Sequence, residues 1–137
     1  MSETITIHAT ITAPITKVWD CWTNPVHITQ WAFASDDWEA PKASNDVRVG
    51  RTFSTIMSAK DKSAGFDFAG TYTAVIPNEL IEYDMDGDNR HVKIVFEQTT
   101  GGVHITQTFD AETENPIEMQ RNGWQSILNN FKRYCER

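Results

Sequence analysis

The chain has 137 residues, of which 39% are hydrophobic and 11% aromatic, and its formal net charge is −7. This length predicts one domain over residues 1–137, which can bury enough surface to fold without a metal or a disulfide. The acidic balance and the scattered Lys and Arg residues exclude a nucleic-acid-binding protein and a protein of anionic membrane surfaces, because both need clustered positive charge.

The first part of the sequence predicts one strand followed by two short helices. Residues 4–11 alternate strictly between apolar and polar side chains, a pattern typical of a half-buried strand. Pro14 stands at a favourable first helical position, before apolar residues at helical spacing. Asn24 is a favourable N-cap and Pro25 a favourable first residue for a second helix, which runs through Trp31.

The middle of the sequence predicts a loop and then a run of strands. Residues 32–45 show no clear period and contain turn residues, so we expect a loop there. Every second residue from Phe66 to Ile76 shares one face of a long strand. In all, alternation predicts strands over residues 46–59, 66–76, 80–85, 91–99 and 103–109.

The last two of these strands form a hairpin whose register follows from their apolar faces. Matching those faces pairs Phe96 with Ile105. The same register places Glu97 opposite His104 on the outer face.

The C-terminal segment predicts a long helix. Asn115 is a favourable N-cap, Pro116 a favourable first residue, and Glu118 completes a capping box. The order of elements predicts an α+β fold, in which a curved antiparallel sheet of six to seven strands wraps around this helix, with two short helices after the first strand. A cavity forms between sheet and helix if the facing side chains do not fill the space. The helix turns one apolar stripe toward the sheet: Ile117, Trp124, Ile127, Leu128, Phe131, Tyr134 and Cys135.

Four short motifs follow one another in an order that resembles a known superfamily. They are Thr12-Ala13-Pro14-Ile15 with Val18-Trp19, Asp46-Val47-Arg48-Val49-Gly50, Gly70-Thr71-Tyr72 with Tyr83, and Gly123-Trp124 with Leu128 and Phe131. Together they resemble the AHSA-type branch of the SRPBCC superfamily, the START-like helix-grip domains. The resemblance covers essentially the whole chain and implies a helix-grip fold. The branch is named for homology to activators of the ATPase of the ninety-kilodalton heat-shock protein, so the resemblance also implies a chaperone as a candidate partner.

The sequence predicts neither a metal site nor a cofactor. Its four histidines lack the usual spacings of zinc ligands. The segment that begins at Asp84 has acidic residues at alternate positions, as a calcium loop does. Asn89 and Val95 stand where such a loop needs Gly and Glu, so we expect an acidic hairpin turn over residues 84–88 instead.

Nucleophilic catalysis also lacks a sequence signature. There is no G-x-S-x-G motif, and Cys21 and Cys135 lie among apolar neighbours, where a thiol has a raised pKa and is inert. We expect both as buried reduced thiols of a cytoplasmic protein. Because the N-terminus is polar and alternating, we expect no signal peptide, and no apolar run approaches the ~18 residues that a membrane span needs.

Aromatic and polar side chains that face the expected cavity are the candidate ligand contacts. By parity Gln98 and Gln107 lie on the apolar face of the last hairpin, and Gln120 and Arg121 lie at the edges of the helix stripe. Because an unpaired buried amide costs about 1–3 kcal/mol, these groups reach solvent, bond one another or meet a ligand. The candidate ligand-binding residues are Trp31, Phe33, Trp38, Phe53, Phe68, Tyr72, Tyr83, Phe96, Gln98, Gln107, Gln120 and Trp124. The first three form either a lid over the cavity or a plug inside it.

These observations favour a non-enzymatic domain that binds a small hydrophobic or amphipathic molecule in the cavity. The first alternative is a cyclase- or dehydratase-like enzyme, which needs an acid or base inside the cavity. Asp67 and Asp84 face outward by parity, which leaves Tyr72 and Tyr83 as the best candidates. The second alternative is a chaperone-associated interaction module, for which only the acidic turn and Asp36-Asp37 offer a surface patch.

Overall fold

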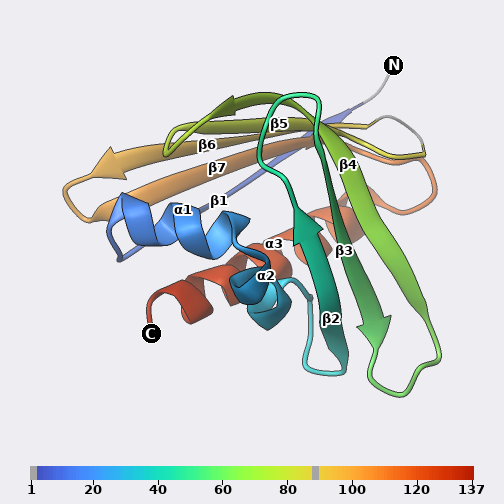
Figure 1. Ribbon diagram of the computed structural model, residues 1–137. Coiled ribbons are helices and arrows are strands. Elements are labelled where there is room, and N and C mark those ends of the chain that lie inside the picture. The colour runs from blue at the N-terminus through green and yellow to red at the C-terminus, as the bar shows by residue number, and fades with distance from the viewer. Residues whose placement is uncertain (1–2, 88–89) are drawn as a thin grey trace.

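An antiparallel sheet curls around one long helix in this protein (Figure 1). The computed structural model describes residues 3–87 and 90–137. The strands are β1 (Thr4–Ile11), β2 (Trp38–Asn45), β3 (Thr52–Ala59), β4 (Gly65–Ile76), β5 (Leu80–Met85), β6 (His91–Thr99) and β7 (Gly102–Asp110). The helices are α1 (Ile15–Thr23), α2 (Pro25–Trp31) and α3 (Ile117–Cys135). The sheet order β1-β7-β6-β5-β4-β3-β2 and its antiparallel pairing confirm the predicted α+β architecture.

The core lies between the concave face of the sheet and the three helices. In Figure 1, α3 runs beneath the sheet, and α1 and α2 lie beside it. Buried side chains alternate along the strands, as Ile5 and Ile7 do on β1. The apolar stripe of α3 meets them through Leu128, Phe131 and Cys135, and burial of this apolar surface is the main contribution to stability.

Two local predictions are confirmed. Asn24 caps α2, because its Oδ1 accepts a hydrogen bond from the backbone N–H two residues later at 3.1 Å. In the β6–β7 hairpin Phe96 pairs with Ile105, and Glu97 lies opposite His104. Local capping chemistry and strand alternation therefore specify these features.

The predicted capping box of α3 is wrong. The residue before the helix is Pro116, and no described side chain caps the N-terminus of α3. Asn115 instead donates its side-chain amide to the Glu112 carboxylate at 3.2 Å. Glu118 turns toward solvent, where it pairs with Arg121. The loop before the helix thus uses the capping residues for its own hydrogen bonds.

Residues 32–45, expected as a loop, contain strand β2 at one edge of the sheet. β2 pairs with β3, and its register shifts between Glu39 and Lys42. Pro41 lies in this irregularity, where its missing N–H is tolerated, as at other edge strands and bulges. The irregularity interrupts the two-residue alternation, so the sequence pattern did not indicate a strand.

Strand β3 starts later than predicted because residues 46–51 form a turn. The Arg48 guanidinium donates two hydrogen bonds to the Asp46 carboxylate, at 2.7 and 2.6 Å. Gly50 has a φ of +84°, a conformation that favours glycine. The Asp-x-Arg-x-Gly motif is therefore a turn that leads into β3.

Strand β4 contains a bulge that exchanges its inward and outward faces. Its register with β5 shifts between Tyr72 and Ala74. Beyond the shift Val75 packs against the core, while Ile76 is 47% exposed. The prediction of one apolar face along the whole strand is wrong after Tyr72, because a bulge adds one residue to the alternation.

Candidate functional site

A hollow of about 270 Å³ lies between the concave face of the sheet and α3. Strands β3, β4, β5 and β7 supply most of the sheet side, and α3 supplies the helix side. The rest of the lining comes from α1, α2, Ala32, Asn45 of β2 and Arg90 before β6. Most of its lining is apolar or aromatic. The lining residues are Trp22, Ile28, Trp31, Ala32, Asn45, Phe53, Thr55, Met57, Phe66, Phe68, Tyr72, Ile81, Tyr83, Met85, Arg90, Gln107, Trp124, Ile127 and Leu128.

Aromatic rings hold one another in place along this lining. The centroid of the Phe53 ring lies 4.7 Å from that of the Tyr83 ring, in a T-shaped arrangement, and 5.4 Å from that of the Tyr72 ring. Trp124 meets Phe68 edge-on at 5.8 Å. Edge-to-face contacts of this kind add to the stabilisation from burial and fix ring orientation, so the apolar lining has a defined shape.

Two polar lining residues, Tyr72 and Asn45, form hydrogen bonds to each other, and Asn45 also bonds to the backbone. The Tyr72 hydroxyl donates to Asn45 Oδ1 at 2.5 Å. The Asn45 side-chain amide in turn donates to the Thr23 carbonyl at 2.8 Å, which ties β2 to the end of α1. Burial raises the pKa of Tyr72, so its hydroxyl keeps its proton and acts as a donor at neutral pH.

Three other polar lining residues, Thr55, Tyr83 and Gln107, are buried and have no hydrogen-bond partner among the described residues. Their exposed fractions are 5%, 6% and 6%. Within residues 3–87 and 90–137 none of their side chains forms a hydrogen bond, yet no fully enclosed side-chain nitrogen or oxygen there lacks a partner. Their polar atoms therefore border the hollow. Burial raises the pKa of Tyr83, so its phenol is a neutral donor.

Seven of the predicted ligand contacts line the hollow, and five do not. Those that line it come from six different elements: Trp31, Phe53, Phe68, Tyr72, Tyr83, Gln107 and Trp124. The five outside it are Phe33, Trp38, Phe96, Gln98 and Gln120.

Gln98 does not face the hollow, although parity placed it on the inner side of β6. It is exposed and borders a shallow groove with Asn78 and Glu79. Phe96 is the last buried residue of β6, and the residues after it are exposed. β5 begins at Leu80, which pairs with Val95, so beyond this point β6 has a neighbouring strand on one side only and parity no longer determines burial.

Gln120 is buried, but its amide holds a loop instead of facing the hollow. Its Oε1 accepts from the Glu112 N–H at 2.9 Å, and its Nε2 donates to the carbonyls of Glu112 and Asn115 at 3.2 and 2.8 Å. These bonds occupy the amide and fix the connection from β7 to α3. Gln120 is therefore not among the residues that border the hollow.

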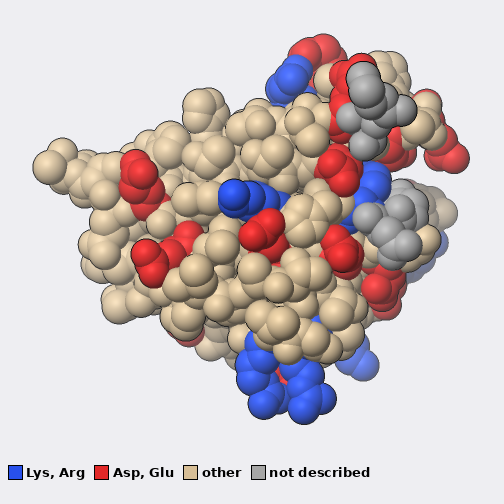
Figure 2. Space-filling model, turned by 90° about the horizontal axis from the view of Figure 1, so that it is seen from above, with Lys and Arg blue, Asp and Glu red and all other residues tan. Residues whose placement is uncertain are grey.

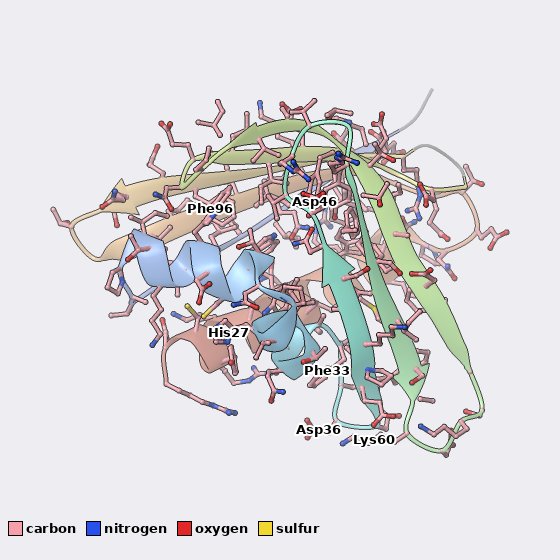
Figure 3. The ribbon with its side chains drawn as sticks, in the orientation of Figure 1. His27, Phe33, Asp36, Asp46, Lys60 and Phe96 are labelled. Atoms are coloured by element: carbon pink, nitrogen blue, oxygen red, sulfur yellow. The ribbon has the colours of Figure 1, made fainter. Side chains whose placement is uncertain are left out.

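The remaining three aromatic residues pack outside the hollow. Phe96 lies between the sheet and α1, where its ring meets Trp19 at 5.3 Å (Figure 3). Phe33 follows the end of α2 and is absent from the lining (Figure 3). Trp38 belongs to β2, and the centroid of its ring lies 6.1 Å from that of the Phe66 ring. Neither Phe33 nor Trp38 forms the expected lid or plug.

Trp31 takes a third role, as part of the lining. It is 6% exposed, and its Nε1–H donates to the Cys21 carbonyl at 2.9 Å. Its ring lies 4.9 Å from that of Phe131 on α3. These contacts fix it in the core, at the border of the hollow.

Several residues that line the hollow were not among the predicted ligand contacts. Thr55 stands between Phe53 and Met57 in a strict alternation, so strand parity would have placed it inside. Asn45 belongs to the segment expected as a loop. Arg90 lies directly before β6, outside the alternating pattern that indicated the strand.

Outside the hollow, two histidines each bond to more than one polar side chain. His91 lies on the outer face of the sheet, with Nδ1 2.7 Å from Asp84 and Nε2 2.8 Å from Glu82. His27 bridges Tyr134 at 2.6 Å and Asp20 at 3.1 Å. In the described part of the chain no group of three or more His, Cys, Asp or Glu side chains is placed to hold a metal ion. The predicted acidic turn over residues 84–88 lies partly outside the described residues.

Cys21 on α1 and Cys135 on α3 are both buried and free, as predicted. Burial raises the pKa of both thiols, that of Cys135 to about 12. Both thiols are therefore protonated at neutral pH. None of the described helices combines the length and apolar character that a membrane crossing requires.

The curled seven-stranded sheet and the long C-terminal helix define a helix-grip domain. The family model of the activator of Hsp90 ATPase homolog 1-like proteins matches residues 12–136, so the chain belongs to this family and the predicted AHSA-type membership is confirmed. No curated protein matches the chain.

Solved structures agree with this assignment. The AHSA1-like protein from Aeromonas hydrophila is 44% identical, covers 98% of this chain and 92% of its own, and superimposes with a TM-score of 0.92. A protein from Cytophaga hutchinsonii is 50% identical with a TM-score of 0.83, over 96% of this chain and 91% of its own. A Chromobacterium violaceum protein shares the fold at 22% identity, with a TM-score of 0.87 over 98% of both chains.

Proposed function

We propose that this protein binds a small hydrophobic or amphipathic molecule in the hollow between the sheet and α3. The observation that carries this proposal is the hollow itself, about 270 Å³ in volume and lined mainly by fixed aromatic and aliphatic side chains. Ligand sites are typically concave and mostly apolar, with a few polar groups that orient the ligand. Membership of the AHSA1-like family supports a binding-domain type of function.

The chemistry of the lining favours binding over catalysis. Among the described residues no carboxylate or imidazole borders the hollow. The best candidates for a general acid or base were Tyr72 and Tyr83, and burial raises the pKa of both. A phenol with a raised pKa is a poor base near pH 7, so these hydroxyls serve as hydrogen-bond donors.

The outer surface supports a ligand inside the protein better than a large protein partner. One exposed large apolar side chain, Phe66, borders the hollow, and the others among the described residues are scattered over α2, the 46–51 turn, the end of β4 and α3: Val26, Val49, Ile76 and Met119. Single exposed apolar residues are ordinary on soluble domains. Titration with the middle domain of the heat-shock chaperone tests the alternative partner in the same preparation.

Neither nucleic acid nor a membrane surface is part of the proposal. The face in Figure 2 mixes acidic and basic side chains, and the net charge is −7. Binding to phosphate-rich surfaces needs clustered cations. We further propose a cytoplasmic location, which the two free buried thiols support.

The test is a panel of lipids, sterols, flavonoids and apolar dyes. Trp22, Trp31 and Trp124 border the hollow, so a bound ligand should change the intrinsic fluorescence. It should also raise the melting temperature, because it binds only the folded state. If no compound changes either signal, the proposal is wrong.

A variant that fills the hollow provides the specific control. Met57 is 7% exposed and borders the hollow, whereas Ser58 points to the other face of β3. Met57→Trp should abolish the ligand-induced shift of melting temperature, and Ser58→Trp should leave it unchanged. Equal loss in both variants would show that binding occurs elsewhere.

A further inference from the structure

Three neutral polar side chains of the lining, Thr55, Tyr83 and Gln107, have no hydrogen-bond partner among the described residues, and two of them, Thr55 and Gln107, lie far apart in the strand order. Gln107 and Thr55 are more than nine-tenths buried, and neither forms a hydrogen bond within the described part of the chain. Leaving such groups unpaired in an apolar site costs free energy. A ligand that supplies the missing hydrogen bonds removes this cost.

The two side chains lie on different strands at a distance across the sheet. Thr55 belongs to β3 and Gln107 to β7, and β4, β5 and β6 separate these strands in the sheet. Because the sheet curls, β3 and β7 lie on different parts of its concave face (Figure 1), and residues of both strands border the hollow. Tyr83 on β5 lies between them in the strand order. Apolar side chains occupy most of the remaining lining.

The lining also indicates the charge of the ligand. No acidic side chain of the described residues borders the hollow, and the one basic side chain there, Arg90, already has an interaction within the protein. Transfer of an ionised group into an apolar site is costly without a counter-charge. Amide and hydroxyl groups match neutral hydroxyls or carbonyls.

We propose that the ligand is an uncharged ring compound with a hydrogen-bonding group at each of two opposite ends, one bound by Gln107 and the other by Thr55. This inference rests on the proposed function and specifies its ligand. The aromatic lining favours flat rings, which it can meet edge-to-face. The volume of about 270 Å³ restricts the ligand to a size below that of most drug molecules. Single-headed amphiphiles such as fatty acids leave one of the two polar groups unpaired and bind more weakly.

The test is a series of compounds that share one apolar body. Biphenyl carries no polar end, para-hydroxybiphenyl carries one, and para,para′-dihydroxybiphenyl carries two. The fourth compound replaces one hydroxyl of the last with a carboxylate. Titration calorimetry at neutral pH should show that each hydroxyl raises affinity by about 5- to 10-fold, the usual range for one hydrogen bond. The carboxylate compound should bind more weakly than para-hydroxybiphenyl.

Variants then assign each end. Gln107→Leu and Thr55→Val should each lower the affinity for para,para′-dihydroxybiphenyl by about 5- to 10-fold and leave that for biphenyl unchanged. Gln98→Leu and Thr106→Val make the same changes outside the hollow, at an exposed site and on the outer face of β7. These controls should bind all four compounds as the unmodified protein does.

The outcomes separate this inference from the proposed function. If neither the biphenyl series nor the wider panel binds, the proposed function fails. If biphenyl binds as tightly as its dihydroxy derivative, or the carboxylate compound binds most tightly, the function stands and this inference is overturned. Unchanged affinity of both hollow variants for the dihydroxy compound overturns it as well.

Discussion

At the scale of single residues, the polar groups that suit the hollow to a ligand reduce stability when it is empty. The Thr55 hydroxyl is buried and has no hydrogen-bond partner among the described residues. Thr55→Val keeps the shape and removes the hydroxyl. We expect it to raise the free energy of unfolding by about 1 kcal/mol, the low end of the range for an unsatisfied buried group.

Urea unfolding of the unliganded protein measures this effect. Thr106→Val, on the outer face of β7, is the matched control and should change stability little. A loss of stability in Thr55→Val that is absent from the control would mean that the hydroxyl has a partner in the folded protein. A gain would show that the hollow was built for binding at the expense of stability.

His91 makes stability depend on pH. Its hydrogen bonds to Glu82 and then to Asp84 raise its pKa above the ordinary value. The folded-state pKa therefore lies above the unfolded one, which is about 6.5. The stabilisation is fully present below the unfolded pKa and is lost as the pH rises through the folded pKa.

His91→Asn should therefore flatten the pH profile of stability. The unmodified protein should lose stability relative to the variant as the pH rises from about 5.5 to about 8.5. Melting temperatures across this range provide the measurement. His104→Asn, at another histidine of the outer face, is the control. Parallel profiles of the unmodified protein and His91→Asn would contradict the prediction.

At the scale of elements, α3 both covers the core and protects an edge of the sheet. β1 is an edge strand, and its outward carbonyls are open to pairing with another chain. Gln125 donates to the His8 carbonyl at 3.2 Å, and Lys132 donates to the Thr10 carbonyl at 2.5 Å. Helix side chains thus occupy acceptors that a foreign strand would use.

Lys132→Met tests this protection, because it keeps the aliphatic stem and removes the donor. It should lower the free energy of unfolding by about 1 kcal/mol, a typical hydrogen-bond contribution. It should also increase light scattering at temperatures below the unfolding transition. Arg133→Met, one residue further on the same helix, is the control and should behave as the unmodified protein. Equal scattering in both variants would argue against edge protection.

The periodicity within each element explains which helices and strands the sequence could predict. Alternation and helical spacing act between neighbours in the chain, so β1, the β6–β7 hairpin and the stripe of α3 were predicted. β2 was missed because Pro41 and the register shift break the alternation. The bulge after Tyr72 reversed parity in β4 for the same reason. The prediction fails wherever one residue disturbs the period.

At the scale of the whole molecule, the site was harder to predict than the fold. Gln98 and Gln107 have the same strand parity, yet only Gln107 borders the hollow, because the end of β6 extends beyond its neighbour β5. Gln120 faces inward, but the loop before α3 occupies its amide. Whether a space remains depends on how side chains from several elements fill it, which no local pattern contains.

The two cysteines allow opening of the whole molecule to be measured. Cys21 and Cys135 are 3% and 0% exposed and belong to one core that joins α1, α3 and the sheet. Their raised pKa and their burial predict negligible alkylation of the folded protein at pH 7, and full alkylation in urea. Labelling under native conditions then requires the core to open, and both thiols should react at the same rate, which mass spectrometry can follow.

A bound ligand should slow this labelling by an amount fixed by its affinity. At about 100 times its dissociation constant a ligand stabilises the folded state by about 2.7 kcal/mol, so labelling should slow by about 100-fold. With para,para′-dihydroxybiphenyl as the probe, both thiols should be protected equally, because the hollow and the thiols share one cooperative core. Protection of neither thiol despite saturating binding would mean that α1 and the end of α3 open independently of the hollow.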